Sequence, residues 1–147
     1  MERPSEREIL TTGGLEPSQT PVRAVMSPGV IAVSGDTTVR RCAQTMATRK
    51  THAVLVIDDR ERTPIGWVLH ADILGYLRED PFTTRAADVV SAEAAYIDPD
   101  ETVEDAADRM TEQGLTHLLV GYGPESVPEG VLSSWDVVAH YAGLGSA

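Results

Sequence analysis

The sequence has a single cysteine, few aromatic residues and no long apolar run. Cys42 is the one cysteine of 147 residues, so an internal disulfide framework is excluded. No apolar run approaches the roughly 18–20 residues that a membrane-spanning helix needs, and we expect no membrane contact. The first residues lack the apolar core of a secretory signal. These absences predict a cytoplasmic protein.

Basic residues are also scarce, because 12 Lys and Arg stand against 23 Asp and Glu, a net charge of -11. Residues 81–147 carry twelve acidic and two basic side chains, whereas residues 21–80 carry seven acidic and eight basic ones. An acidic chain repels the phosphate backbone, so we expect no nucleic-acid partner. The hydrophobic fraction of 41% nevertheless indicates a globular protein rather than a disordered one.

Motifs of catalysis and metal binding are missing. The sequence has neither a P-loop nor the glycine pattern of dinucleotide-binding enzymes. Its four histidines have no metal-ligand spacing with Cys or carboxylates, and no pair of nucleophile and base stands out. We therefore expect no enzymatic activity, no metal site and no required cofactor.

An internal repeat is present instead. Residues from 22 onward match the second half at a constant offset of 64, without gaps, across about fifty residues. Identical residues meet at Val25/Val89, Ser27/Ser91, Asp36/Asp100, Met46/Met110, Leu55/Leu119, Pro64/Pro128, Gly66/Gly130 and Asp72/Asp136. The match predicts two related structural units, residues 21–80 and 81–147, after an N-terminal tail or arm of residues 1–20.

Each copy predicts the order β-α-β-β-α. In the first copy we expect strands at 30–33, 53–57 and 65–69 and helices from 39 and over 70–78. In the second we expect strands at 95–97, 117–120 and 131–133 and helices from 103 and over 134–142. Apolar residues at helical spacing, Val39, Cys42, Ala43 and Met46, predict a core-facing side with a packed, unreactive thiol at Cys42. Two such copies can cover each other's exposed sheet faces, which predicts one compact module with pseudo-two-fold symmetry.

The last strand-to-helix junction carries the sharpest motif. Ser133 precedes the helix and Asp136 follows three residues later, a spacing typical of a helix-capping box. The same carboxylate could instead accept hydrogen bonds from the vicinal hydroxyls of a ribose. The earlier copy has Leu69 in place of the serine but keeps Asp72, which suggests a role for the acid beyond capping.

The duplication resembles the tandem CBS domain pair, or Bateman module, over residues 22–143. The resemblance rests on the ungapped repeat, the element order, the run from Gly130 to Asp136, and the spacing of Met46, His52 and Val56. It implies an α/β (α+β) fold of two stacked repeats that acts as a sensor and catalyses no reaction. It also implies a homodimer, a regulated partner in trans, and an adenosine ligand such as AMP, ADP, ATP or S-adenosylmethionine.

The resemblance further implies two clefts between the repeats. The main cleft combines a ribose-binding acid and hydroxyl with a strand of the other repeat, and comprises Ser27, Ile31, Ala32, His52, Ser133 and Asp136. Arg49 and Lys50 lie just upstream of His52, separated from it by Thr51, and could add phosphate contacts. The second cleft lacks the junction serine and lies in the acidic repeat, so we expect it to bind less well; it comprises Asp72, Ser91, Tyr96 and His117, with Leu69, Ala95 and Thr116.

A second interpretation needs no ligand. The Ser133–Asp136 spacing would then be only a cap, and His52 a histidine at a strand edge. The module would dimerise through its closing helices and present Trp135, Tyr141 or the N-terminal arm to a partner. Replacing Asp136 separates the two interpretations, because it would abolish ligand binding in the first and change only stability in the second.

Overall fold

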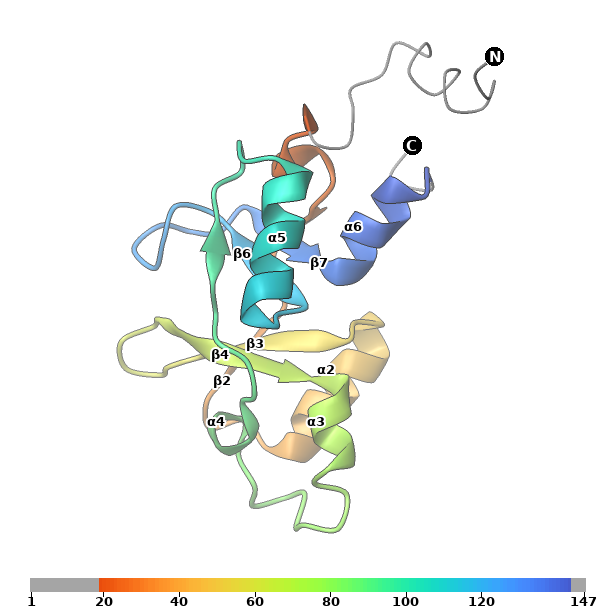
Figure 1. Ribbon diagram of the computed structural model, residues 1–147. Coiled ribbons are helices and arrows are strands. Elements are labelled where there is room, and N and C mark those ends of the chain that lie inside the picture. The colour runs from red at the N-terminus through yellow and green to blue at the C-terminus, as the bar shows by residue number, and fades with distance from the viewer. Residues whose placement is uncertain (1–18, 144–147) are drawn as a thin grey trace, which may run out of the picture.

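The structure is a computed structural model that describes residues 19–143. The predicted N-terminal tail therefore lies almost entirely outside the described residues. Two halves, one above the other in Figure 1, each combine a small sheet with helices.

The first half contains a three-stranded sheet in the order β2-β3-β4. β2 and β3 run parallel, and β4 is antiparallel to β3. Its elements are β2 (Ala32–Ser34), α2 (Val39–Arg49), β3 (Ala53–Ile57), β4 (Pro64–Leu69), α3 (His70–Leu74) and α4 (Ala86–Val89).

The second half contains a four-stranded sheet in the order β1-β7-β6-β5. Its elements are η2 (Val22–Ala24), β1 (Ser27–Pro28), β5 (Tyr96–Ile97), α5 (Val103–Gln113), β6 (His117–Val120), β7 (Gly130–Ser133) and α6 (Ser134–Tyr141). The predicted order of β-α-β-β-α is thus confirmed in both copies, as is the mixed α/β class.

The two long helices begin and end at equivalent residues. Thr38 caps α2 by accepting a hydrogen bond from Arg41 N at 3.2 Å, and Thr102 caps α5 in the same way. Both helices close with a left-handed residue, Gly114 after α5 and Lys50 after α2. Glycine adopts this conformation without a steric penalty, whereas lysine does not.

The buried strands contribute alternate residues to different cores. Val54 and Val56 pack toward α2. Leu55 lies in a central cluster with Trp67 of its own sheet and Leu119 of the other sheet. This central cluster confirms that the repeats cover each other's sheets. Cys42 is fully buried against β3, and desolvation raises its pKa to about 11, in agreement with a packed thiol.

Each half receives a short segment from the other copy. β1 pairs antiparallel with β7 through Ser27 and Val131. At the equivalent place, Trp67 N donates to Ala92 O at 2.8 Å. A Cβ at Gly130 would lie 2.2 Å from Ser27 O, and one at Gly66 would lie 2.5 Å from Ala92 O. These two glycines therefore permit the close approach of the exchanged segments.

Some elements differ from the sequence expectation. The prediction of a helix over 70–78 was too long, because α3 ends at Leu74. Gly75 N and Tyr76 N bond to carbonyls three residues back, so the helix tightens into turns. The short segments β1, η2 and α4 were not predicted, since their pairing partners lie in the other repeat.

Candidate functional site

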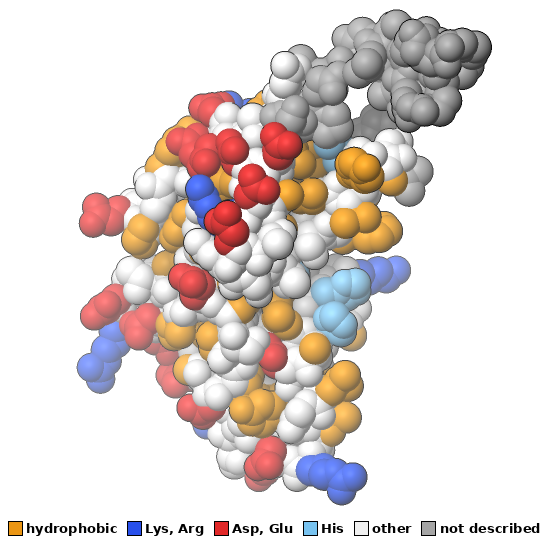
Figure 2. Space-filling model, in the orientation of Figure 1, with side chains coloured by type: hydrophobic (Ala, Val, Ile, Leu, Met, Phe, Trp, Pro, Cys, Tyr) orange, Lys and Arg blue, Asp and Glu red, His pale blue; other side chains and the backbone are white. Residues whose placement is uncertain are grey.

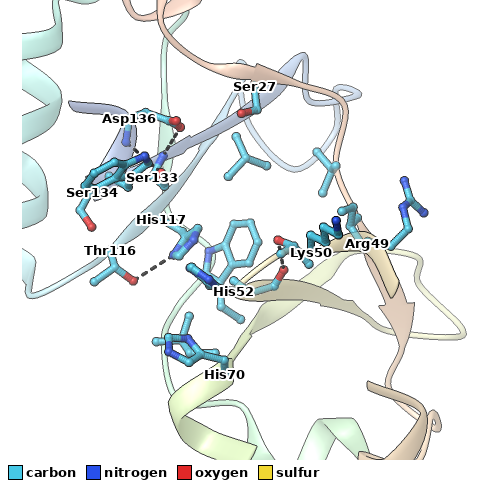
Figure 3. Close-up of a pocket in the computed structure, with 18 of the residues that line it drawn as sticks. Ser27, Arg49, Lys50, His52, His70, Thr116, His117, Ser133, Ser134 and Asp136 are labelled. Atoms are coloured by element: carbon cyan, nitrogen blue, oxygen red, sulfur yellow. Dashed lines mark hydrogen bonds between the residues drawn. The ribbon is translucent and has the colours of Figure 1, made fainter. Parts of the chain in front are cut away.

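A cavity of about 990 Å³ lies between the two halves. Figure 3 shows the labelled side chains Ser27, Ser133 and Asp136 at one end and His52, Lys50, Arg49 and His70 at the other. Five of the six residues predicted for the main cleft line it: Ser27, Ile31, His52, Ser133 and Asp136. Ala32 does not line it, because this residue is exposed in β2, where it pairs with Leu55.

The open ends of two hairpins form part of the cavity wall. Pairing of Ala53 with Leu69 places His52 opposite His70, and His70 N donates to His52 O at 2.8 Å. The two imidazole rings lie 4.8 Å apart, centroid to centroid. Sequence analysis missed His70, although the antiparallel register of the hairpin could have identified it.

The other hairpin repeats this geometry with hydroxyl side chains. Pairing of His117 with Ser133 places Thr116 opposite Ser134, and Ser134 N donates to Thr116 O at 2.8 Å. All four of these residues line the cavity. The cavity thus has an imidazole pair on one hairpin and a hydroxyl pair at the equivalent positions of the other.

The junction at Ser133 forms a complete capping box. Ser133 N donates to Asp136 Oδ2 at 2.9 Å, and Asp136 N donates to Ser133 Oγ at 3.0 Å. The second carboxylate oxygen, Oδ1, accepts no hydrogen bond from the described residues. Ser27, which also lies in the described part, forms no hydrogen bond to Asp136 either. Asp136 can therefore hold its helix and still accept hydrogen bonds from a molecule in the cavity.

The junction at Asp72 is closed by the protein itself. Asp72 Oδ2 accepts hydrogen bonds from Leu69 N at 2.7 Å and from Ser91 Oγ at 2.6 Å. Ser91 is the repeat counterpart of Ser27, and neither Asp72 nor Ser91 lines the cavity. The role of Asp72 beyond capping is thus a contact between the repeats in this structure.

The remaining predicted residues of the second cleft separate. Tyr96 packs in the central cluster, where burial raises its pKa and its hydroxyl has no partner among the described residues. His117 lines the same cavity as Asp136, together with Thr116 and Leu69. The structure therefore brings His117 to the main cavity rather than to a separate one.

His117 is the most enclosed imidazole of the cavity. Its ring lies 5.3 Å from that of Trp67, and its Nδ1 lies 2.9 Å from Thr116 Oγ1. Burial lowers its pKa most, the carboxylate of Asp136 acts in the opposite direction, and the neighbouring imidazoles of His52 and His70 lower it further. Burial therefore favours the neutral form of His117.

Positive charge gathers along one wall. Arg49 and Lys50 lie at the end of α2 and line the cavity, and Asp136 is the one carboxylate among the described residues that line it. Lys50 has φ 54° and ψ 46°, the conformation that Gly114 adopts in the other repeat. Lys50 therefore lines the cavity from a backbone conformation that costs a lysine more than a glycine.

Two further searches cover the described residues. None of their His, Cys, Asp and Glu side chains form a group of three or more that could hold a metal ion. None of their helices is long and apolar enough to cross a membrane.

Comparison with solved structures shows the same fold. The CBS domain of a bacterial CNNM/CorC family Mg²⁺ transporter in complex with ATP is 18% identical, with 95% of this chain and 99% of that chain covered and a TM-score of 0.77. Another crystallised CBS domain is 26% identical, with 84% and 98% covered and a TM-score of 0.72. A CBS-domain containing protein from Agrobacterium tumefaciens is 18% identical, with 87% and 98% covered and a TM-score of 0.72.

Sequence comparison gives the family directly. No curated protein sequence matches the chain. The sequence profile of the CBS domain family matches the chain twice, at residues 22–79 and 86–143. These two matches span most of the chain and coincide with its internal repeat, so the chain belongs to the CBS domain family and contains a tandem pair of these domains.

Proposed function

We propose that this tandem CBS pair is a regulatory module that binds an adenine nucleotide in the cavity between its repeats. The observation that carries the proposal is the division of the cavity into two ends. Ser27, Ser133 and Oδ1 of Asp136 offer hydrogen-bond partners for ribose hydroxyls, and the opposite end carries basic side chains. A related fold with ATP bound supports this choice of ligand.

The cavity also suits the base. Its wall between the two ends includes apolar side chains of both repeats, among them Val30, Ile31 and Val131. A purine can pack between such residues, as small-molecule sites generally combine apolar walls with a few placed polar groups. The volume of about 990 Å³ falls at the upper end of ordinary ligand sites.

Output would follow from the position of the ligand between the repeats. A ligand that binds one arrangement of the two halves more tightly than another shifts the population toward it. The regulated activity would then reside in a partner that reads the arrangement. A non-catalytic, regulatory role of this kind agrees with the two CBS domains that make up the described chain.

Direct titration with AMP, ADP and ATP tests the proposal. Trp67 and Trp135, the two tryptophans of the sequence, both line the cavity, so ligand binding should change their fluorescence. Asp136→Ala should weaken binding by tenfold or more, on the order of the 1.5–3 kcal/mol of a charged hydrogen bond. Asp72→Ala is the matched control, because it removes an equivalent acid outside the cavity. Equal affinities of both variants would contradict the proposal.

A homodimer is a second proposal, favoured by exposed apolar residues on the closing helices. Figure 2 shows hydrophobic side chains exposed where α6 lies. The exposed residues of this region and of the segment from α3 onward include Leu74, Leu77, Trp135, Val138 and Tyr141. Clusters of this kind mark interaction surfaces. Light scattering of the wild type and of Tyr141→Glu tests it; a dimer that the substitution splits supports the interface, and a wild-type monomer excludes it.

A further inference from the structure

The long helices of the two repeats are equivalent in sequence and opposite in charge. At the offset of 64, Arg40 and Arg41 of α2 correspond to Glu104 and Asp105 of α5. α2 carries three exposed basic side chains and no acidic one, whereas α5 carries four exposed acidic side chains: Arg40, Arg41 and Arg49 against Glu104, Asp105, Asp108 and Glu112. The two repeats therefore differ in the charge of the same surface.

These charges are not balanced within the chain. Within residues 19–143, none of the seven side chains forms an ion pair. Arg109, the basic residue of α5, is half-buried, donates to Tyr96 O at 2.8 Å and pairs with Glu101. Figure 2 shows acidic side chains gathered over α5. The two helices therefore present fields of opposite sign to the solvent, and each attracts a helix of the other kind.

The closing helices add apolar side chains beside these charges. α3 packs against α2, and α6 packs against α5. Leu74 and Leu77, at the end of α3 and in the turn after it, correspond to Val138 and Tyr141 of α6, and all four are exposed. Burial of these patches favours association, but their similarity does not select an orientation.

The shape of this surface differs between the repeats. A groove of about 460 Å³ lies between α2 and α3, with Ala43, Ala47 and Ile73 among its lining residues. Trp135 of α6, which also borders the cavity, is 67% exposed, whereas its counterpart in α3 is the small Ala71. The second repeat thus projects a large aromatic side chain, and the first repeat has an apolar groove.

We propose that two copies of the chain associate antiparallel, so that α2 and α3 of each copy contact α5 and α6 of the partner. The inference rests on the homodimer proposed above and adds its orientation. A two-fold dimer makes each contact twice, so the antiparallel arrangement brings a basic α2 to an acidic α5 at two equivalent places. The parallel arrangement instead brings α2 against α2 and α5 against α5, and like charges at an interface disfavour association.

Exchange of one pair of charges tests the orientation. In the antiparallel dimer, Arg40→Glu places an acid against the acidic α5 of the partner, and Glu104→Arg places a base against the basic α2. Each should weaken dimerisation at least about tenfold, because the repulsion acts at two places. The combined variant Arg40→Glu/Glu104→Arg restores opposite charges and keeps the net charge of -11. Its dissociation constant should return to within about threefold of the wild-type value.

Arg60→Glu is the matched control. It makes the same change of charge as Arg40→Glu, but in the turn between β3 and β4, which Figure 1 shows on the side of the molecule opposite to α6. Its dissociation constant therefore measures the effect of net charge alone. Asp108→Arg is a second acid-to-base variant, because Glu104 lies in the first turn of α5, where an acid stabilises the helix. Far-ultraviolet circular dichroism identifies the variants that keep the fold.

Sedimentation equilibrium without nucleotide measures the dissociation constants. Weaker association of the single variants of α2 and α5, with Arg60→Glu near the wild type and the combined variant restored, supports the antiparallel dimer. Tighter association of these single variants overturns the orientation and leaves the homodimer intact. Single variants with the dissociation constant of Arg60→Glu, or a combined variant as weak as the single ones, also overturn it. A monomeric wild type overturns both the orientation and the homodimer, and none of these outcomes depends on nucleotide binding.

Discussion

The two strand-to-helix junctions of this protein share a carboxylate but use it differently. Asp136 caps its helix with one oxygen and lines the central cavity, whereas Asp72 caps its helix and binds Ser91 across the repeats. Of the two serines equivalent by sequence, Ser91 donates to Asp72, whereas the hydroxyl of Ser27 forms no hydrogen bond with residues 19–143. Both copies have the same fold, but the Asp136 junction lines the cavity whereas the Asp72 junction is bonded to Ser91.

The glycines beneath the two junctions should give the largest effects. Gly130→Ala forces a Cβ against Ser27 O, and Gly66→Ala forces one against Ala92 O. We expect each to lower the free energy of unfolding by about 3 kcal/mol, as overpacking against backbone does. Denaturant unfolding measures this cost. Only Gly130→Ala should also weaken nucleotide binding, because Ser27 lines the cavity and Ala92 does not. A Gly130→Ala protein as stable as the wild type would contradict the pairing of β1 with β7.

The serines test the comparison with a smaller change. Ser91→Ala removes the hydrogen bond to Asp72 and should destabilise the protein by about 1 kcal/mol. Ser27→Ala breaks no hydrogen bond within the described residues, so its unfolding midpoint should equal that of the wild type while its affinity for the nucleotide falls. Unfolding curves and titrations of both variants give the answer. If Ser27→Ala lowered stability and Ser91→Ala lowered affinity instead, the ligand would bind at the Asp72 junction in solution and not at the Asp136 junction.

Lys50 and Gly114 occupy equivalent helix ends and should respond in opposite directions. Relief of a left-handed lysine is worth about 1–2 kcal/mol, and the greater freedom of unfolded glycine offsets roughly 0.5–1 kcal/mol of it. Lys50→Gly should therefore stabilise the protein by about 0.5 kcal/mol, and Gly114→Lys should destabilise it. Thermal unfolding of the two variants checks the signs, and a destabilised Lys50→Gly protein would show that the lysine contributes to the fold.

His117 and its counterpart Ala53 provide the smallest effect, which depends on pH. Burial lowers the pKa of His117 in the folded state below its ordinary value of 6.5, so the unfolded chain binds the proton first as the pH falls. The contribution of the neutral imidazole to stability is complete above about pH 6.5 and is lost at lower pH. The free energy of unfolding should fall less between about pH 7 and pH 5 for His117→Ala than for the wild type. An unchanged loss would indicate that His117 is solvated.

Much of the fold could be predicted because the sequence states it twice. Hydrophobic periodicity and the offset of 64 identified the two long helices and the main strands, and the stacking followed from the uncovered sheet faces. The segments η2 and α4 escaped prediction because they are held by hydrogen bonds to the other repeat. Val22 N of η2 donates to Glu101 O, and Ala86 N of α4 donates to Thr37 O, so neither segment carries a local signal.

The site was predictable only in part, for a similar reason. The Ser133–Asp136 spacing indicated both a cap and a ligand contact; the structure shows the cap, and within its described part Oδ1 of Asp136 accepts no hydrogen bond. His70 enters the cavity through strand register, and Asp72 leaves the site through a bond to Ser91. Such pairings depend on the relative position of distant segments, which residue spacing along the chain does not determine.

A crystal structure of the protein grown with ATP tests the central claim most directly. The account predicts one nucleotide per chain, with the ribose beside Asp136 and Ser133 and the phosphates toward Lys50, His52 and His70, while Ser91 remains bonded to Asp72. A nucleotide beside Asp72, with the bond to Ser91 broken and the cavity at Asp136 empty, would contradict it.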